Sequence, residues 1–275
     1  MSNKMKILAT SDPHYPWCRD ALPKLEELIE KERPDVFVVA GDISQFDDDH
    51  YREYFETFQK FVMQKVAVLG NHDLWAEDGS SLERFKRVCG LMKERDFYPL
   101  DQQPLILDGV GFVGTIGWYD YSFANLTRED GVVELGGKVK RLRDITFDDY
   151  AAKETWNDGM HIRWGLTDEQ FLNLCVKKLK QDINQVSVQA DRIVAVVHHA
   201  PFENMVPYKE GDAAFLMRNA YMGSPKLGEA LLSSRKVQAL ITGHTHFPMV
   251  KQNGHIACYN VSAPYGNISH QIINL

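Results

Sequence analysis

Apolar residues follow two alternating patterns along the first hundred positions of the chain. Short and mostly apolar runs lie at residues 6–10, 36–40 and 66–69. Runs of this kind are typical of parallel strands that are buried on both faces. Apolar residues recur instead at helical spacing over residues 22–31, 51–63 and 82–93. This order predicts a parallel sheet whose strands are joined by helices.

The pattern changes in the second part of the chain. Pairs of apolar runs flank the turn signals Asp108-Gly109 and Asn253-Gly254, which predicts hairpins at 105–116 and 249–259. Further buried strands are predicted at residues 192–197 and 237–242, and a further helix at 171–183. Parallel strands and hairpins together indicate an α/β fold, a sandwich of two mixed sheets covered by helices.

No repeat, low-complexity tract or flexible linker divides the sequence, so we expect residues 1–275 to form a single domain. Residues from about 118 to 165 show little periodicity and carry many charges. A long irregular stretch in a compact domain is usually a functional loop or a lid. We therefore expect an irregular insertion or lid at about 118–165.

Composition narrows the class of protein. The chain has 275 residues, of which 44% are hydrophobic and 25% charged, as in soluble globular proteins. Its 31 basic and 38 acidic residues give a net charge of −7, which argues against a nucleic-acid polymer as partner. The apolar runs are too short to span a bilayer, and the four cysteines are far apart in the sequence, with no CxxC pair. We expect a cytoplasmic protein without a membrane partner, and the oligomeric state stays open.

Acidic and imidazole side chains, with one asparagine, gather where the predicted strands end. They are Asp12 and His14, Asp42, Asn71 and His72, His198 and His199, and His244 and His246. Because ligands of open α/β sheets bind beyond the carboxyl ends of the strands, we expect these segments to converge on one site. Residues two apart in an extended segment point the same way, so each such pair in this set can hold one ion.

The chemistry of this set points to divalent metal ions. The set offers oxygen from Asp and Asn and nitrogen from His, without cysteine. Such ligands are typical of a site for Mn, Fe, Zn or Co rather than of a structural zinc site, which is rich in cysteine thiolates. More than six such ligands are too many for one ion. Two ions about 3.5–4 Å apart, bridged by one carboxylate, would use them, and such a pair suits displacement at phosphorus. The residues therefore predict phosphoester hydrolysis.

The same residues form five motifs that resemble those of a known family. The motifs are Asp12-x-His14, Gly41-Asp42, Gly70-Asn71-His72-Asp73, His198-His199-Ala200-Pro201 and Gly243-His244-Thr245-His246. Their content and order over residues 7–247 resemble the motif set of the calcineurin-like metallophosphoesterases. The resemblance implies an αββα sandwich of two mixed β-sheets flanked by helices, which agrees with the predicted order of elements.

The resemblance also implies two divalent ions, which in the family are Mn, Fe, Zn, Co or Ni. The first ion would be held by Asp12, His14 and His246. The second would be held by Asn71, His198 and His244. Asp42 would bridge the two ions, and a bridging water or hydroxide would attack phosphorus in line.

Two neighbouring residues have further implied roles, and one ligand has a competitor. By the resemblance, His72 would stabilise the transition state or protonate the leaving oxygen, and Asp73 could orient its imidazole. The fourth motif contains two adjacent histidines, which point in opposite directions in a strand. Pro201 aligns best with the family pattern if His198 is the ligand and His199 is its neighbour.

Four residues are candidates for contact with substrate. Tyr15 and Trp75 closely follow the first and third motifs, so both would line the rim of the cleft. Ordinary packing of aromatic rings explains them equally well. His161 lies in the insertion, from which a side chain could reach over the metals, and a structural histidine is the alternative. His199, next to the predicted ligand, completes the set.

These residues predict an enzyme, a metal-dependent phosphoesterase that acts on a small phosphoester, with a phosphodiester favoured. The first alternative is a phosphomonoesterase that uses the same site, and the second is a metal-binding scaffold without turnover. His72 argues against the scaffold, which needs ligands but no acid for a leaving group. The third alternative is a nuclease, against which the net charge of −7 argues.

Overall fold

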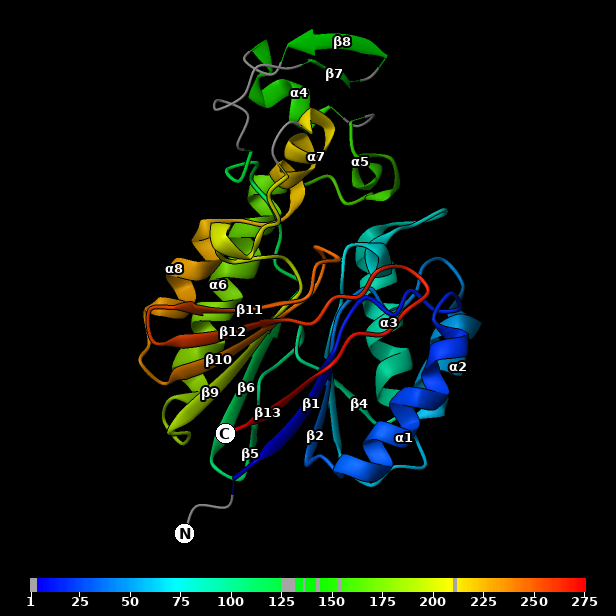
Figure 1. Cartoon of the computed structure of the whole chain (residues 1–275), viewed down its shortest axis with the longest axis vertical. Coiled ribbons are helices and arrows are strands. Elements are labelled where there is room, and N and C mark those ends of the chain that lie inside the picture. Colours follow the sequence, from blue (N-terminus) through cyan, green and yellow to red (C-terminus); the bar gives the residue numbers. More distant parts are fainter. Residues whose placement is uncertain (1–3, 125–131, 136, 142–143, 153–154, 210–211) are drawn as a thin grey trace.

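The computed structural model describes residues 4–124, 132–135, 137–141, 144–152, 155–209 and 212–275. Two β-sheets pack face to face, and helices cover the outer face of each sheet (Figure 1). Each sheet contains parallel and antiparallel pairs of strands. The predicted α/β sandwich of two mixed sheets flanked by helices is therefore confirmed.

The first sheet has the strand order β13-β1-β2-β3-β4. Its strands are β1 (Lys6–Thr10), β2 (Val36–Ala40), β3 (Gln64–Val68), β4 (Phe97–Pro99) and β13 (Gln271–Asn274). Strands β1 to β4 run parallel, and β13 pairs antiparallel with β1. The outer face is covered by α1 (Leu22–Glu32), α2 (Asp48–Thr57) and α3 (Ser81–Glu94) (Figure 1).

The second sheet has the strand order β11-β12-β10-β9-β6-β5. Its strands are β5 (Leu105–Leu107), β6 (Val110–Thr115), β9 (Arg192–Val197), β10 (Val237–Thr242), β11 (Met249–Asn253) and β12 (Ile256–Asn260). The four central strands run parallel, whereas the edge strands β5 and β11 pair antiparallel. The outer face is covered by α6 (Asp168–Val186) and α8 (Pro225–Leu232) (Figure 1).

Strand β2 shows why the apolar runs are continuous. Val36 and Val38 pack between the sheets, where they join an apolar cluster with Val194 of β9. Phe37 and Val39 point the opposite way into the cluster that includes the helices. Because both faces are buried, every position is apolar. The parallel alignment brings the carboxyl ends of β1, β2 and β3 to the same edge of the sheet.

Several element boundaries differ from the predicted ones. Helix α2 ends at Thr57, although the apolar spacing continues to Met63, which packs on the core from outside the helix. The apolar pattern does not predict β4, β13 and α8, because elements of three to eight residues are too short to leave a clear periodic pattern. No helix in the described part of the chain is long and apolar enough to cross a membrane.

The prediction of an irregular stretch at about 118–165 is wrong for part of that stretch. It contains a hairpin of β7 (Val132–Leu135) and β8 (Lys138–Arg141) and the helices α4 (Phe147–Ala151) and α5 (Asn157–His161). Elements of four or five residues leave little periodicity in a sequence. Residues 125–131, 136, 142–143 and 153–154 of the stretch lie outside the described residues. In Figure 1 these elements lie with α7 (Ala213–Arg218) beyond one end of both sheets.

Candidate metal centre

The predicted metal ligands lie on loops at the carboxyl ends of strands from both sheets. The loops after β1, β2 and β3 carry Asp12, His14, Asp42 and Asn71. The loops after β9 and β10 carry His198, His244 and His246. All are buried except His246, which is partly buried. The sandwich thus brings together side chains that are far apart in the sequence, as the strand-end pattern predicts.

Five of these residues adopt a backbone conformation that is rare outside glycine. The φ angle is 55° at Asp12, 43° at His14, 52° at Asp42, 68° at His244 and 55° at His246. Left-handed conformations of this kind persist only where surrounding contacts hold them, and they cluster at functional sites. Their concentration on these loops indicates that the fold accepts strain in order to aim these side chains.

The side chains form three overlapping groups in which the candidate ligand atoms lie within 4.8 Å of one another. The groups are Asp12, His14 and His246; His14, Asp42 and His72; and Asp42, His198 and His244. Asp42 and His14 each belong to two groups, so the three groups merge into one cluster. Asn71 joins it because its Oδ1 lies 3.2 Å from Nε2 of His198.

The surroundings of His14 show whether this cluster suits a metal ion. Both of its ring nitrogens are buried without a hydrogen-bond partner, and Nε2 lies 3.6 Å from Oδ2 of Asp42. A buried polar atom without a partner is unfavourable. Burial lowers the pKa of His14 well below its usual value although Asp42 opposes the shift, so the ring is neutral. A neutral imidazole beside a carboxylate is the form that binds a metal, and the residues therefore fit one.

Backbone carbonyl groups orient the three histidines of the second sheet. Nδ1 of His198 lies 2.8 Å from the carbonyl oxygen of Ala40, and Nε2 of His244 lies 3.2 Å from that of Tyr221. In the same way, Nδ1 of His246 lies 2.5 Å from a backbone carbonyl oxygen, that of residue 263. A carbonyl accepts a hydrogen bond, so the bonded nitrogen carries the proton. The other nitrogen of each ring is then directed away from that carbonyl, and for His198 it faces the oxygens of Asn71 and Asp42, an arrangement common among metal-binding histidines.

The carboxylate of Asp42 stays charged at the centre of the cluster. Burial raises its pKa, but the neighbouring rings of His198 and His72 outweigh burial and hold the pKa well below its usual value. For His198, burial lowers the pKa, and the Asp42 and Asp12 carboxylates outweigh it and raise the pKa to about 9. A buried carboxylate that needs positive charge beside it is suited to a cation.

The structure separates the two adjacent histidines. His198 lies in the cluster with Asp42 and His244, which supports it as the ligand. His199 points away, and its Nδ1 lies 3.0 Å from the carbonyl oxygen of Ile116. Its fully buried ring lies behind His244, with 4.2 Å between ring centroids. His199 therefore lies behind the cluster and is not among the residues that line the cavity beside it, so its contact with substrate stays a prediction without structural support.

His72 faces the cluster, but Asp73 does not orient it. Nε2 of His72 lies 4.0 Å from Oδ2 of Asp42, and Nδ1 lies 3.1 Å from Oε1 of Gln45. The carboxylate of Asp73 accepts hydrogen bonds from the backbone N–H groups of residues 43, 44 and 70 and from the hydroxyl of Tyr51. The predicted role of Asp73 is therefore wrong. Asp73 holds the two loops together, and Gln45 contacts the imidazole in its place.

Of the other predicted contacts, Trp75 lies at the site and Tyr15 does not. The ring of Trp75 stacks on His72 at 3.8 Å between centroids and on His161 at 4.7 Å. His161 therefore touches the site through Trp75. The hydroxyl of Tyr15 donates to Glu53 at 2.7 Å, and the side chain is buried. The packing alternative thus holds for Tyr15, whose hydroxyl is drawn to a carboxylate of α2.

The sequence reading misses Asp158, which lies in the insertion and is only 1% exposed. Four side chains donate to its carboxylate: Asn71 at 2.9 Å, Trp75 at 2.7 Å, Tyr119 at 3.2 Å and Trp156 at 3.1 Å. The bond to the Asn71 amide nitrogen turns Oδ1 of Asn71 toward His198. In the sequence, Asn157-Asp158-Gly159 is typical of a turn, so no local signal reveals this contact.

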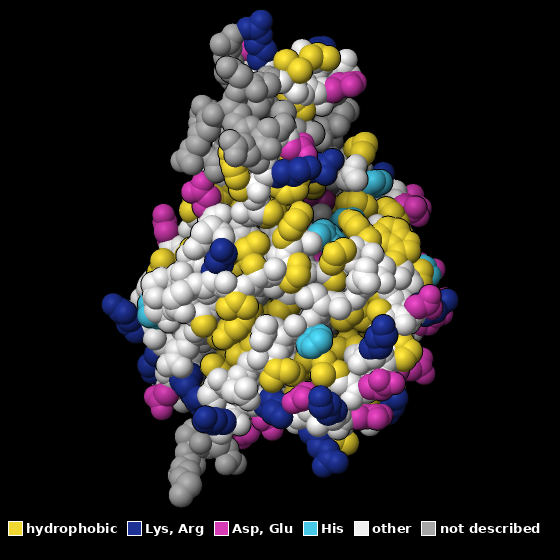
Figure 2. Space-filling model, in the orientation of Figure 1, with side chains coloured by type: hydrophobic (Ala, Val, Ile, Leu, Met, Phe, Trp, Pro, Cys, Tyr) yellow, Lys and Arg dark blue, Asp and Glu magenta, His cyan; other side chains and the backbone are white. Residues whose placement is uncertain are grey.

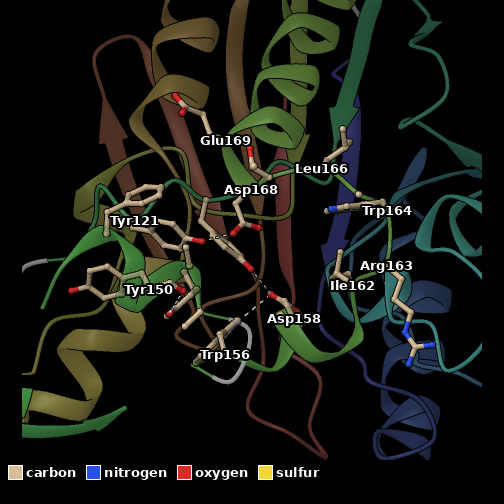
Figure 3. Close-up of a pocket in the computed structure, with 18 residues that line it drawn as sticks. Tyr121, Tyr150, Trp156, Asp158, Ile162, Arg163, Trp164, Leu166, Asp168 and Glu169 are labelled. Carbon is tan, nitrogen blue, oxygen red and sulfur yellow. Dashed lines mark hydrogen bonds between the residues drawn. The ribbon is translucent and has the colours of Figure 1, made fainter. Parts of the chain in front are cut away.

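Two cavities lie near Asp158, and Trp156 lines both of them. One, of about 770 Å³, is lined by Asp42, Asn71, His72, His244 and His246, and it therefore opens on the cluster. The other, of about 710 Å³, lies within the insertion and is lined by Asp158, Tyr121, Tyr150, Trp164 and Asp168 (Figure 3). Among the described residues, the second cavity has none of the predicted metal ligands in its lining. The first cavity is therefore the candidate active site.

The model of the calcineurin-like phosphoesterase family matches residues 5–248 of the chain. The chain belongs to this family. The match covers all five motifs, so the resemblance that they indicate is confirmed. Because the family depends on metals, it agrees with the cluster of Asp and His side chains at the strand ends.

Solved structures share the fold at low sequence identity. A phosphopantetheinyl hydrolase from Mycobacterium tuberculosis has a TM-score of 0.66 at 18% identity, over 97% of this chain and 92% of that chain. A protein from Thermus thermophilus has a TM-score of 0.57 at 12% identity, over 98% and 99%. A dimetal phosphatase from Danio rerio has a TM-score of 0.51 at 14% identity, over 94% and 87%. A comparison with curated protein sequences gives no match.

Proposed function

We propose that the protein hydrolyses a phosphoester, with a phosphodiester favoured, and that it uses two divalent ions. The observation that carries this proposal is the position of Asp42, which belongs to two groups of candidate ligand atoms within 4.8 Å of one another. A charged, buried carboxylate shared by two such groups is suited to bridge two cations. Membership of the calcineurin-like phosphoesterase family supports the reaction class.

Each ion has its own set of side chains in this proposal. One ion would be held by Asp12, His14 and His246. The other would be held by Asn71, His198 and His244, and Asp42 would be shared by both. The donor set of oxygen and imidazole nitrogen suits Mn, Fe, Zn, Co or Ni. When bound, the ions supply Lewis acidity for the phosphoryl group and for water.

His72 handles the proton of the leaving group. Gln45 Oε1 accepts from Nδ1 of the ring, so Nε2 faces the cavity, where it can hold a proton for the departing oxygen. The stacked ring of Trp75 fixes the plane of the imidazole. The cavity of about 770 Å³ beside the cluster has space for a second ester group, as a diester requires.

The test is to purify the protein without chelator, to measure bound metals by mass spectrometry and to assay two model esters with Mn. The expected result is about two ions per chain and faster cleavage of bis-p-nitrophenyl phosphate than of p-nitrophenyl phosphate. Faster cleavage of the monoester would indicate that the enzyme is a phosphatase that uses the same site, and not a phosphodiesterase. Bound metal without turnover of either ester would favour the scaffold, and absence of metal and activity would refute the proposal.

A further inference from the structure

Apart from the candidate metal ligands, the wall of the cavity beside the cluster is largely apolar. Six large side chains form most of it: Trp75, Trp156, Phe215, Met222, Phe247 and Tyr265. They come from the loop after β3, from the insertion, from α7 and the segment between α7 and α8, and from the loops after β10 and β12. A cavity of about 770 Å³ with such a lining is typical of sites that bury a large organic group.

Two of these rings remain unusually exposed beside the cluster. Phe247 is 46% exposed and Tyr265 is 52% exposed. Tyr265 stacks on His246 at 4.5 Å between centroids, and Phe247 meets Phe215 edge to face at 5.7 Å. On the face shown in Figure 2, hydrophobic side chains and histidines lie together just below the insertion. Exposed apolar groups that gather at one place mark a contact surface.

The charge of the lining limits what the organic group can be. Arg218, the last residue of α7, is the only Lys or Arg among the described residues that line this cavity. A polyanion such as nucleic acid needs several cations along its path. A sugar or a polyol needs many hydrogen-bond partners, whereas the neutral polar side chains on this wall are Asn157, Asn219 and Thr245. One cation on an apolar wall fits one additional anionic group.

We propose that the substrate is a phosphoester with a bulky apolar organic group, which packs against this wall, and with one further anionic group, which pairs with Arg218. This inference rests on the proposed function, since the phosphoryl group would lie at the cluster. Burial of one aromatic ring corresponds to about a tenfold to hundredfold gain in affinity. The effect is large enough to measure in a series of esters.

The first experiment compares p-nitrophenyl diesters that share the leaving group and differ in the second ester group: methyl, n-octyl, phenyl and 1-naphthyl. With the Mn-loaded full chain, we expect kcat/KM to rise at least about tenfold from methyl to the large groups. Comparison of the n-octyl ester with the two aryl esters shows whether the cavity prefers an alkyl chain or an aromatic ring. Phe247→Ala should remove most of this rise, whereas Val250→Ala, an exposed apolar residue outside the cavity, should keep it. A flat series in an active enzyme would overturn the inference.

The second experiment tests the anionic group. We expect a 4-carboxyphenyl ester to exceed the phenyl ester in kcat/KM by about fivefold to tenfold, as for an ion pair at a partly desolvated site. Arg218→Gln should remove this preference, and Arg218→Lys should retain part of it because the charge remains. An equal preference in wild type and Arg218→Gln would refute the role of Arg218.

A binding measurement separates failure of this inference from failure of the proposed function. Metal-free full-length protein is titrated with 1-naphthylphosphonate and with methylphosphonate, and tryptophan fluorescence and calorimetry report binding. Preference for the naphthyl compound without turnover of any ester would refute the proposed function but not the apolar subsite. Turnover of all esters at equal rates, with no preference in binding, would refute the subsite alone.

Discussion

The two sheets position their candidate metal ligands in different ways. The histidines of the second sheet, such as His198 and His244, are oriented by backbone carbonyl groups. In the first sheet, Asp12 and Asp42 accept hydrogen bonds from the backbone N–H groups of residues 244 and 72. Asn71 differs from all of these, because its amide is held by the side chain of Asp158, 87 residues away in the sequence.

This difference determines which of these orientations a single substitution can disturb. A backbone group keeps its hydrogen bond when its side chain changes, so the orientation of the histidines is robust to most single substitutions. Asn71 depends on one replaceable carboxylate in the insertion. Two further backbone hydrogen bonds join the insertion to the segment after β3. One runs from the N–H of residue 76 to the carbonyl of His161 at 3.1 Å, and the other runs from the N–H of Ser81, at the start of α3, to the carbonyl of residue 163 at 3.0 Å. We infer that this part of the insertion is a fixed wall of the site.

The largest expected effect comes from Asp42→Asn, which removes the charge that the two sheets share. We expect kcat/KM to fall by about 10³-fold or more and the bound metal to drop below two ions per chain, because a neutral amide bridges cations poorly. Metal analysis and assays with Mn check both results. Asp191→Asn, at a fully exposed carboxylate, is the control. Unchanged metal content in Asp42→Asn would remove Asp42 from the centre.

His72→Ala separates proton transfer from metal binding within the first sheet. We expect turnover to fall by about 10²- to 10⁴-fold, as for loss of a general acid, with metal content unchanged. His161→Ala removes the ring on the far side of Trp75 and should have a smaller effect. If His72→Ala lost metal as well as turnover, His72 would be a ligand and the acid would lie elsewhere.

Asp158→Ala tests the dependence of Asn71 on the insertion. Asn71 and Trp75 donate to one carboxylate oxygen of Asp158, and Tyr119 and Trp156 donate to the other, so loss of the whole carboxylate removes the partner that fixes the orientation of Asn71. We expect metal affinity to fall by about 10- to 100-fold, measured by competition with a chromogenic chelator. Asp168→Ala is a matched control, since Asp168, the first residue of α6, accepts from Trp118 and Tyr121 and lines the second cavity, where Figure 3 shows it beside Tyr121. Equal losses in both variants would indicate general destabilisation.

The smallest effect on catalysis is expected for Asp101→Asn. This variant tests the hydrogen bonds that connect the two sheets. Asp101 accepts backbone N–H bonds from Leu69 after β3 and from Ile116 after β6, both at 2.7 Å. An amide can accept only one of them, so we expect a loss of about 1–3 kcal/mol in the free energy of unfolding. Urea denaturation of metal-free protein measures this loss, and metal affinity should change little.

The same residue gives a pH dependence with a definite sign. Burial raises the pKa of Asp101 to about 6, although the two backbone N–H groups and Lys178 oppose the shift. As pH falls below 6, the folded state takes up a proton before the unfolded state does, so this residue contributes more stability between pH 6 and 4. The difference in unfolding free energy between wild type and Asp101→Asn should therefore change by about 1 kcal/mol per pH unit in this window. A difference that stays constant from pH 7 to 5 would contradict the raised pKa.

The sequence predicts the sandwich and the ligand-bearing loops well because both depend on local patterns. Continuous apolar runs identify β2 and β9, and the residues that follow each run identify the site. Short elements such as β7 and α5 leave no such pattern, so the insertion appears irregular. Tyr15 shows the same limit in the site, since its position beside a motif does not reveal its hydrogen bond to Glu53.

The sequence by itself determined which kinds of ligand are present, in which order, and at the ends of which strands. Only the tertiary structure decided that Gln45 rather than Asp73 contacts His72, that His199 lies behind His244, and that Asp158 orients Asn71. The physical reason is that hydrophobic periodicity encodes which face of an element is buried. The partner of a polar side chain depends instead on which distant segments the packing brings within hydrogen-bond distance.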